Sequence, residues 1–197
     1  MKPRLLRTLH HHQTGAAAIE FALVTPVLLF VLMGMLNLAQ MVFGQAVLTG
    51  EVQTAARSGS LDGTSTTAAE TKIKNALKPI LVSVSGVTTS RQSYRDFSDI
   101  GRAEQFTDTN SNGTCNAGET YTDENGNGQW DSDIGKTGTG GPGDVITFTV
   151  KATYAPIFKM PFAKADWASK TLKAVSVRKN KAPGSQASYG TTMKTCS

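Results

Sequence analysis

The thirty residues from Phe21 to Gly50 contain no charged side chain, and this run limits the possible folds more than any other feature of the sequence. About 20 apolar residues in a helix span the hydrocarbon core of a bilayer, so the run is long enough, with some surplus. The sequence therefore predicts a membrane-spanning helix near the N-terminus. Large apolar residues fill its centre: Leu23, Val24, Val27, Leu28, Leu29, Phe30, Val31, Leu32, Met33, Met35, Leu36 and Leu38.

Three basic residues, Lys2, Arg4 and Arg7, precede the apolar run. By the positive-inside rule they keep the N-terminus in the cytoplasm and send the rest of the chain across the membrane. A cleaved secretory signal peptide has an apolar part of only about 7–15 residues, whereas an uncleaved signal anchor fits the length of the run. Neither explains Glu20, because an acid within such a segment is costly and usually has a function and a partner.

Residues 14–59, TGAAAIEFALVTPVLLFVLMGMLNLAQMVFGQAVLTGEVQTAARSG, resemble the start of the TadE-like minor pseudopilins of bacterial tight-adherence (Flp-type) pili. The resemblance implies that a prepilin peptidase cuts after Gly15, which makes Ala16 the first residue of the mature chain and Glu20 the fifth. It also implies that Glu20 pairs with the N-terminal amine of a neighbouring subunit, and such a pair can be desolvated together where one charge alone is not. Several classical pilins have Phe where this chain has Ala16.

The same resemblance implies where the chain acts and with what. The expected partners are other pilin or pseudopilin subunits, the prepilin peptidase, the inner-membrane pilus assembly machinery and membrane lipid. The chain is then a single-pass protein of the bacterial inner membrane with a cytoplasmic N-terminus and a periplasmic C-terminal domain. All three histidines, His10 to His12, belong to the leader that processing removes.

We divide the sequence into a basic leader at residues 1–15, a transmembrane and pilin-like helix at 16–58, and a periplasmic domain at 59–197. Glycine, serine and threonine dominate residues 58–67, which predicts a linker after the helix. Within the domain, residues 107–134 form an acidic insert.

The rest of the domain predicts one helix and several strands. Residues 68–81 place apolar side chains at helical spacing, and residues 81–87 indicate a short strand. Residues 144–156 alternate apolar side chains with threonine and lysine, the pattern of a half-buried strand, and residues 171–179 suggest another strand. We therefore expect an α+β fold with a small core, in which an antiparallel sheet packs on the helix.

The first half of the acidic insert matches the twelve-residue calcium loop position by position. Calcium prefers about six to eight hard oxygen ligands, and the alternating spacing turns them inward. Gly113 stands at place 6, where the sharp turn favours glycine. The ligands expected at places 1, 3, 5, 7, 9 and 12 are Asp108, Asn110, Asn112, Thr114 through its carbonyl, Asn116 through a water, and Glu119.

A second copy of the pattern follows after three residues, and it is incomplete. Place 12 is Ile134, which cannot ligate, and Asp133 one residue earlier substitutes only if the backbone shifts. We therefore expect the second site to borrow a ligand from the first loop. The residues at its places 1, 3, 5, 7 and 9 are Asp123, Asn125, Asn127, Gln129 and Asp131, with Gly128 at place 6.

The spacing leaves no room for EF-hand helices between the two loops, so these are helix-free calcium loops. The competing interpretation is a solvated Asp/Asn/Gly loop, since such residues dominate turns. The repeated motif favours calcium as a structural ion, and the six acids between Asp108 and Asp133 would repel one another without a cation. Cys115 and Cys196, 81 positions apart, either pair as a disulfide or remain free thiols.

Composition argues against nucleic-acid binding and catalysis. The net charge of +5 is an average, because removing the six acids from Asp108 to Asp133 leaves 5 − (−6) = +11, and no segment combines clustered arginine with aromatic residues. A processed chain contains no histidine, which excludes Ser-His-Asp and Cys-His sites and His-ligated zinc. Residues 135–144 lack the spacing of a phosphate-binding loop. We therefore expect that the chain is not an enzyme and that it does not bind nucleic acid.

Two hypotheses of different class remain. The first is a minor pseudopilin or assembly factor of a Flp/Tad pilus, processed after Gly15 and braced by calcium. The alternative is an uncleaved, membrane-anchored, extracytoplasmic calcium-binding adhesin or receptor module. The N-terminal residue of the purified protein discriminates between them.

Overall fold

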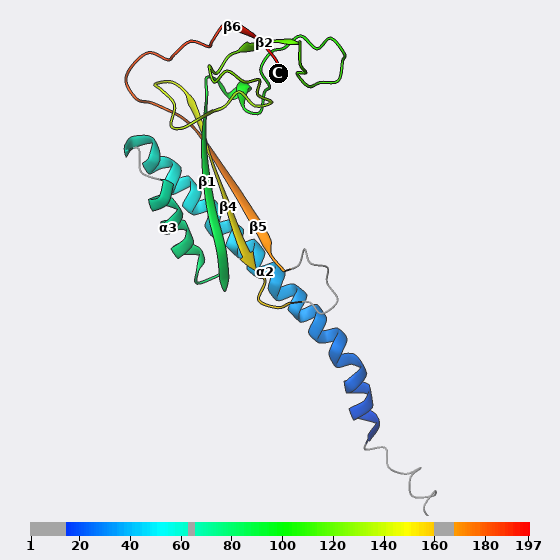
Figure 1. The fold of residues 1–197 in the computed structure, drawn as a ribbon. Helices are drawn as coiled ribbons and strands as arrows, with labels where there is room; N and C mark the ends of the chain where they lie inside the picture. Colours follow the sequence, from blue (N-terminus) through cyan, green and yellow to red (C-terminus); the bar gives the residue numbers. More distant parts are fainter. Residues whose placement is uncertain (1–14, 63–65, 160–167) are drawn as a thin grey trace, which may run out of the picture.

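The computed structural model describes residues 15–62, 66–159 and 168–197 (Figure 1). Residues 1–14, which include the basic residues and histidines of the leader, lie outside the described residues. In chain order the elements are α2 (Ala16–Asp62), α3 (Thr66–Leu77), β1 (Ser83–Tyr94), the 3-10 helix η2 (Phe97–Asp99), β2 (Thr120–Asp123), β3 (Lys136–Thr137), β4 (Val145–Ala155), β5 (Lys170–Lys179) and β6 (Thr192–Thr195).

Helix α2 is a single 47-residue helix, about 70 Å long at 1.5 Å per residue. Among the described residues it is the one helix long and apolar enough to cross a membrane, and its most apolar part is exposed. The helix continues to Asp62, four residues past the predicted end at residue 58. The extension contains no proline and one glycine, so nothing in it forces the helix to end at residue 58.

Four strands form an antiparallel sheet in the order β3-β1-β4-β5, and β2 pairs separately with β6. β1 pairs with β4 from Ser83↔Ala155 to Tyr94↔Val145, so it extends well beyond the predicted strand at residues 81–87. The extension carries mostly polar side chains, and its strand conformation depends on pairing with β4 rather than on its own apolar pattern.

Helices α2 and α3 lie on one face of the sheet (Figure 1). The predicted alternation of β4 is confirmed from Phe148 to Tyr154, where Lys151 is exposed between buried neighbours. It is wrong at Thr147, which is 5% exposed and buried like the apolar residues on either side. The α+β class with an antiparallel sheet packed on helix is also confirmed. Helices, strands and the connection to β1 all contribute to the core: Leu48, Val52, Ala55, Ile73, Leu77, Leu81, Phe148, Val150, Ala152, Tyr154, Leu172 and Ala174.

The second half of α2 belongs to this core. Leu48 and Val52 are fully buried between the helix and the sheet. Gly44 permits the close approach, because a Cβ at this position would lie 2.9 Å from Cδ2 of Leu81 and 3.2 Å from Cδ1 of Leu172. The same helix therefore forms the candidate membrane span with its first half and part of the hydrophobic core of the domain with its second half.

The acidic insert and the C-terminal tail form an irregular lobe at the end of the sheet farthest from the N-terminal half of α2 (Figure 1). The β2–β6 pairing, from Thr120↔Thr195 to Asp123↔Thr192, joins the two segments. A small second cluster of Tyr94, Ile134 and Val145, with Tyr189 against it, packs the lobe onto the end of the sheet.

Candidate functional site

The start of α2 contains the residues predicted for processing and subunit docking. Gly15 immediately precedes the helix, and Ala16 is its first residue. Glu20 lies one turn later, exposed, with no hydrogen bond or ion pair to any other described residue. The carboxylate is therefore available to a group from outside the described chain.

Two polar side chains inside the apolar run make specific contacts that the sequence did not predict. Asn37 donates from Nδ2 to the carbonyl of Phe158 at 2.9 Å and accepts from its N–H at 3.1 Å. Gln40 donates to the carbonyl of Ile80 and accepts from the N–H of Ile157, each at 3.3 Å. Both amides thus hold to α2 the two loops at one end of the sheet, before β1 and after β4.

The first acidic loop turns its side-chain oxygens onto its own backbone. Asp108 accepts from the N–H of Gly113 at 2.8 Å, and Asn110 accepts from the N–H of Asn112 at 3.0 Å. Asn112 accepts in turn from the N–H of Thr114 at 2.9 Å. Gly113 has φ of +76°, the left-handed conformation that favours glycine at place 6.

Glu119 closes the first loop from its twelfth place. Its side chain is buried, with Oε1 accepting from the N–H and hydroxyl of Thr109 at 2.9 and 2.8 Å. Oε2 accepts from the N–H of Asn116 at 2.8 Å. The backbone of Asn116 and the hydroxyl of Thr109 are the largest causes that lower the pKa of Glu119 to about 2, so the carboxylate is charged across the physiological range.

The second loop repeats this arrangement. Asp123 accepts from the N–H of Gly128 at 3.0 Å, and the side chain of Asn125 accepts from the N–H of Asn127 at 2.9 Å. Asn127 accepts from the N–H of Gln129 at 2.8 Å. The predicted residues at places 1, 3, 5 and 7 are therefore gathered in both loops with matching backbone geometry.

Glu104 has the position in the second loop that Glu119 has in the first, and sequence reasoning missed it. Its side chain is 1% exposed, and it accepts from the N–H groups of Glu124 and Asn125 at 2.8 and 3.2 Å and of Asp131 at 3.2 Å. Glu124 and Asp131 stand at places 2 and 9, and Glu119 accepts from the same two places of the first loop. A glutamate upstream of both loops therefore replaces the missing twelfth residue.

Backbone pairing brings Glu104 to the second loop. The N–H of Glu104 donates to the carbonyl of Asp131, and the N–H of Ile134 donates to the carbonyl of Arg102, each at 2.9 Å. Trp130 donates from its indole to the carbonyl of Glu104 at 3.1 Å. The sequence signal available was an acid four residues before the first loop, but no loop template contains that position.

Asp133 and Ile134 do not close the second loop. Asp133 accepts from the hydroxyl of Tyr94 at 2.9 Å and from the N–H of Gly135 at 3.1 Å. Burial and this contact raise the pKa of Tyr94 to about 12. Ile134 is buried in the second cluster. The hydrogen-bonded carboxylate at the end of the loop is that of Glu104, not a shifted Asp133.

The protein's own cations already neutralise part of the acidic insert. Arg102 contacts Glu124 at 2.7 Å and Asp99 at 3.0 Å, and Lys194 contacts Oδ2 of Asp123 at 2.7 Å. Two of the six acids in the insert are thus paired, so the repulsion expected from their number is weaker than the sequence implied. In the described ranges, no three His, Cys, Asp or Glu side chains gather as a metal cluster.

A disulfide joins Cys115 in the first loop to Cys196 in the C-terminal tail, with a Cα–Cα distance of 5.9 Å. The backbone around it is also paired, since the N–H of Cys196 donates to the carbonyl of Glu119 at 2.8 Å. The disulfide and the β2–β6 pairing together hold the chain end against both loops.

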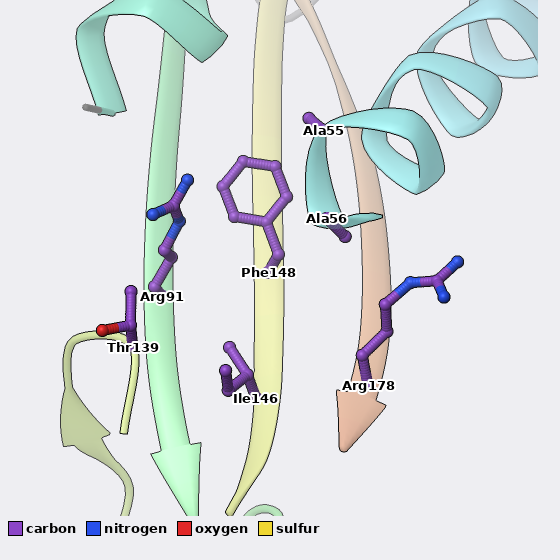
Figure 2. Close-up of a pocket in the computed structure, with 7 residues that line it drawn as sticks. All are labelled: Ala55, Ala56, Arg91, Thr139, Ile146, Phe148 and Arg178. Atoms are coloured by element: carbon purple, nitrogen blue, oxygen red, sulfur yellow. The ribbon is translucent and has the colours of Figure 1, made fainter. Parts of the chain in front are cut away.

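A cavity of about 20 Å³ lies where the end of α2 meets the sheet, between Ala55, Phe148 and Arg178 (Figure 2). Figure 2 shows Arg91 and Arg178 on strands to either side of Phe148. Nε of Arg178 is buried and has no hydrogen-bond partner among the described residues. The volume suits about one water molecule and is far below the several hundred Å³ of a small-molecule pocket.

Residues 15–57 match the model of the family described as TadE-like protein. No protein of curated function and no solved structure matches the chain significantly. The family match begins at Gly15, one residue before α2, and ends at Arg57 within it. It confirms, for this segment of the chain, the resemblance drawn from residues 14–59.

Proposed function

We propose, from the TadE-like segment at residues 15–57, that the chain is a minor pseudopilin or assembly factor of a Flp/Tad adhesive pilus. The observation that carries the proposal is the coincidence of the family match, the start of α2 and an exposed glutamate five residues past Gly15. Prepilin peptidase cleaves after Gly15, and Ala16 becomes the new N-terminus. The expected partners are pilin or pseudopilin subunits, the peptidase, the inner-membrane assembly machinery and lipid.

Glu20 is the docking group in this proposal. It lies among residues that are apolar and exposed, so in a bilayer it faces lipid or another helix. The amine of a neighbouring mature subunit supplies the positive charge that offsets its desolvation. The basic leader keeps the N-terminus in the cytoplasm and places the sheet domain in the periplasm.

Processing is tested by mass spectrometry of the purified protein. We expect Ala16 as the N-terminal residue when the chain is made with its peptidase, and an intact Met1 or Lys2 terminus would favour the uncleaved adhesin or receptor module. Glu20→Ala should leave membrane insertion intact and reduce pilus output. Glu51→Ala on the same helix is the matched control, and equal output from both variants would show that Glu20 is incidental.

Calcium bracing of the distal lobe is the second part of the proposal. The donor set fits the ion, since each loop offers hard oxygens from a carboxylate, two amides and a carbonyl, together with a buried glutamate at its end. Glu119 completes the first loop, and Glu104 completes the second. Burial raises the pKa of Glu104, and a bound cation would favour its charged form.

Calcium binding is measured on the full chain in detergent, by melting temperature and by isothermal titration with calcium and with magnesium. Asp108→Ala should remove the first site alone. Glu104→Gln should weaken the second alone, while Glu51→Gln should change neither. If the Glu104→Gln variant binds calcium at both sites with wild-type affinity, Glu104 is only a structural hydrogen-bond acceptor. If neither the wild-type protein nor any variant responds to calcium, the insert is an ordinary solvated loop.

Catalysis has no place in this proposal. The mature chain has no histidine, and the carboxylates of the lobe already accept hydrogen bonds or pair with cations. The chain is the substrate of a peptidase and acts by assembly.

A further inference from the structure

We propose that one edge of the sheet domain lies in the phospholipid headgroup layer of the membrane that α2 spans. This edge, called the rim below, consists of Lys78, Val82, Ile157 and Lys159. Val82 and Ile157 contact lipid, and the two lysines lie at the lipid phosphates. The inference rests on the membrane span of the proposed function and not on processing or calcium.

The depth of the rim is fixed by hydrogen bonds to α2. The loop at Ile157 and Phe158 is held by Gln40 and Asn37, and the turn at Ile80 is held by Gln40, all within 3.3 Å. The amides of residues 37 and 40 are therefore satisfied by protein rather than left in hydrocarbon. The rim consequently lies level with this turn of the helix.

Helix length places that turn at the boundary of the bilayer. Ala16 to Leu36 is 21 residues, or about 31 Å, close to the roughly 30 Å hydrocarbon core. Counting instead about 20 residues from Phe21, the first residue after Glu20, places the boundary at Gln40, about one turn further along the helix. By either count, residues 37–40 and the rim lie where hydrocarbon gives way to headgroups.

The chemistry of the rim suits that layer. Val82 is 73% exposed and Ile157 is 46% exposed, so both apolar side chains are accessible to lipid. Lys78 and Lys159 are exposed beside them, and Lys159 also borders a surface hollow along the apolar part of α2. Lysine stems commonly lie along apolar surface with the ammonium at the interface, where phosphates are negatively charged.

The two ends of the sheet differ in charge. The described segments at the rim, residues 78–83, 155–159 and 168–170, contain three lysines and no acid, and the intervening residues 160–167 add one lysine and one acid to the sequence. The acidic loops lie at the opposite end (Figure 1). This polarity favours lipid phosphates as the partner of the rim and keeps the acidic end away from them.

The test uses the full chain in nanodiscs of zwitterionic and anionic phospholipids, with a fluorophore on single introduced cysteines and nitroxide-labelled lipids as quenchers. The native cysteines are paired and do not label. The rim positions are Val82→Cys and Ile157→Cys. Met193→Cys in the distal lobe is the matched control, because Met193 is 69% exposed against 73% for Val82. Leu28→Cys reports insertion of the span.

We expect headgroup nitroxides to quench the two rim positions at least about twofold more than Met193, since the headgroup layer is only several Å deep. Chain nitroxides should quench Leu28 most. Quenching of Leu28 with no excess at the rim over Met193 would overturn the inference and favour a protein partner for the rim. Absence of quenching at Leu28 would overturn the membrane span itself.

Discussion

Removing α2 should unfold the sheet domain, although the domain looks separate in sequence. We compare a fragment beginning at Asn37, which keeps the core-forming half of the helix, with one beginning at Gly63, which lacks it. Both retain every strand and the disulfide.

The magnitude follows from what the helix buries. Leu48 is 0% exposed and Val52 is 1% exposed, and burial of such a side chain contributes about 1.5–3 kcal/mol, so the pair contributes about 3–6 kcal/mol. The residues beneath them, among them Phe148, Val150 and Leu172, lose a similar amount when uncovered. The total of about 6–12 kcal/mol is comparable to the whole stability of a typical domain, about 5–15 kcal/mol.

Circular dichroism and urea titration measure the result. The fragment from Asn37 should melt cooperatively, and the fragment from Gly63 should not. Within the full chain, Leu48→Ala should cost about 2–5 kcal/mol, whereas Leu28→Ala, at a side chain that is 51% exposed, should cost less than about 0.5 kcal/mol. A cooperative transition of the Gly63 fragment within a few degrees of the other would refute the reasoning.

Three further predictions concern single features of the domain. Replacing Cys115 and Cys196 together by serine should lower the free energy of unfolding by about 2–4 kcal/mol in urea titration, because an 81-residue loop is released; unchanged stability would show that the lobe opens independently of the core. Gly44→Val should cost about 1–3 kcal/mol by crowding Leu81, while Gly50→Ala, with nothing within 4 Å, should add about 0.5–1 kcal/mol; thermal melting that ranks them the other way would contradict this packing. In metal-free protein, the stability from Glu119 is fully present above its ordinary pKa of 4.5 and is lost as pH falls toward about 2, so Glu119→Gln should flatten the pH dependence of the melting temperature, and parallel curves would argue against it.

The sequence predicted those parts of the fold whose pattern is local. The alternation in β4 and the uncharged run in α2 each determine an element within one segment. The second half of β1 was missed, because its polar residues become a strand only by pairing with β4 some sixty positions later. Asn37 was missed as an anchor for a related reason, since its partner Phe158 is 121 positions away.

The candidate metal ligands show the same limit. A template search identifies Asp108 to Glu119 because all twelve places are consecutive. Glu104 lies outside any twelve-residue loop pattern. Only the antiparallel pairing of residues 102–104 with 131–134 brings its carboxylate to the second loop. The ion pair between Lys194 and Asp123 could not be predicted from the sequence either, because it depends on the pairing of β2 with β6.

The continuity of α2 has a mechanical consequence. A pull on the N-terminal half along the helix axis loads the contacts from Gly44 to Ala55 in shear against β4 and β5, so that many side chains share the force. A helix with a flexible joint at the membrane surface would transmit little of that force. In this chain the helix is continuous from the candidate span into the core, so a displacement of its N-terminal half is passed to the sheet through the helix itself.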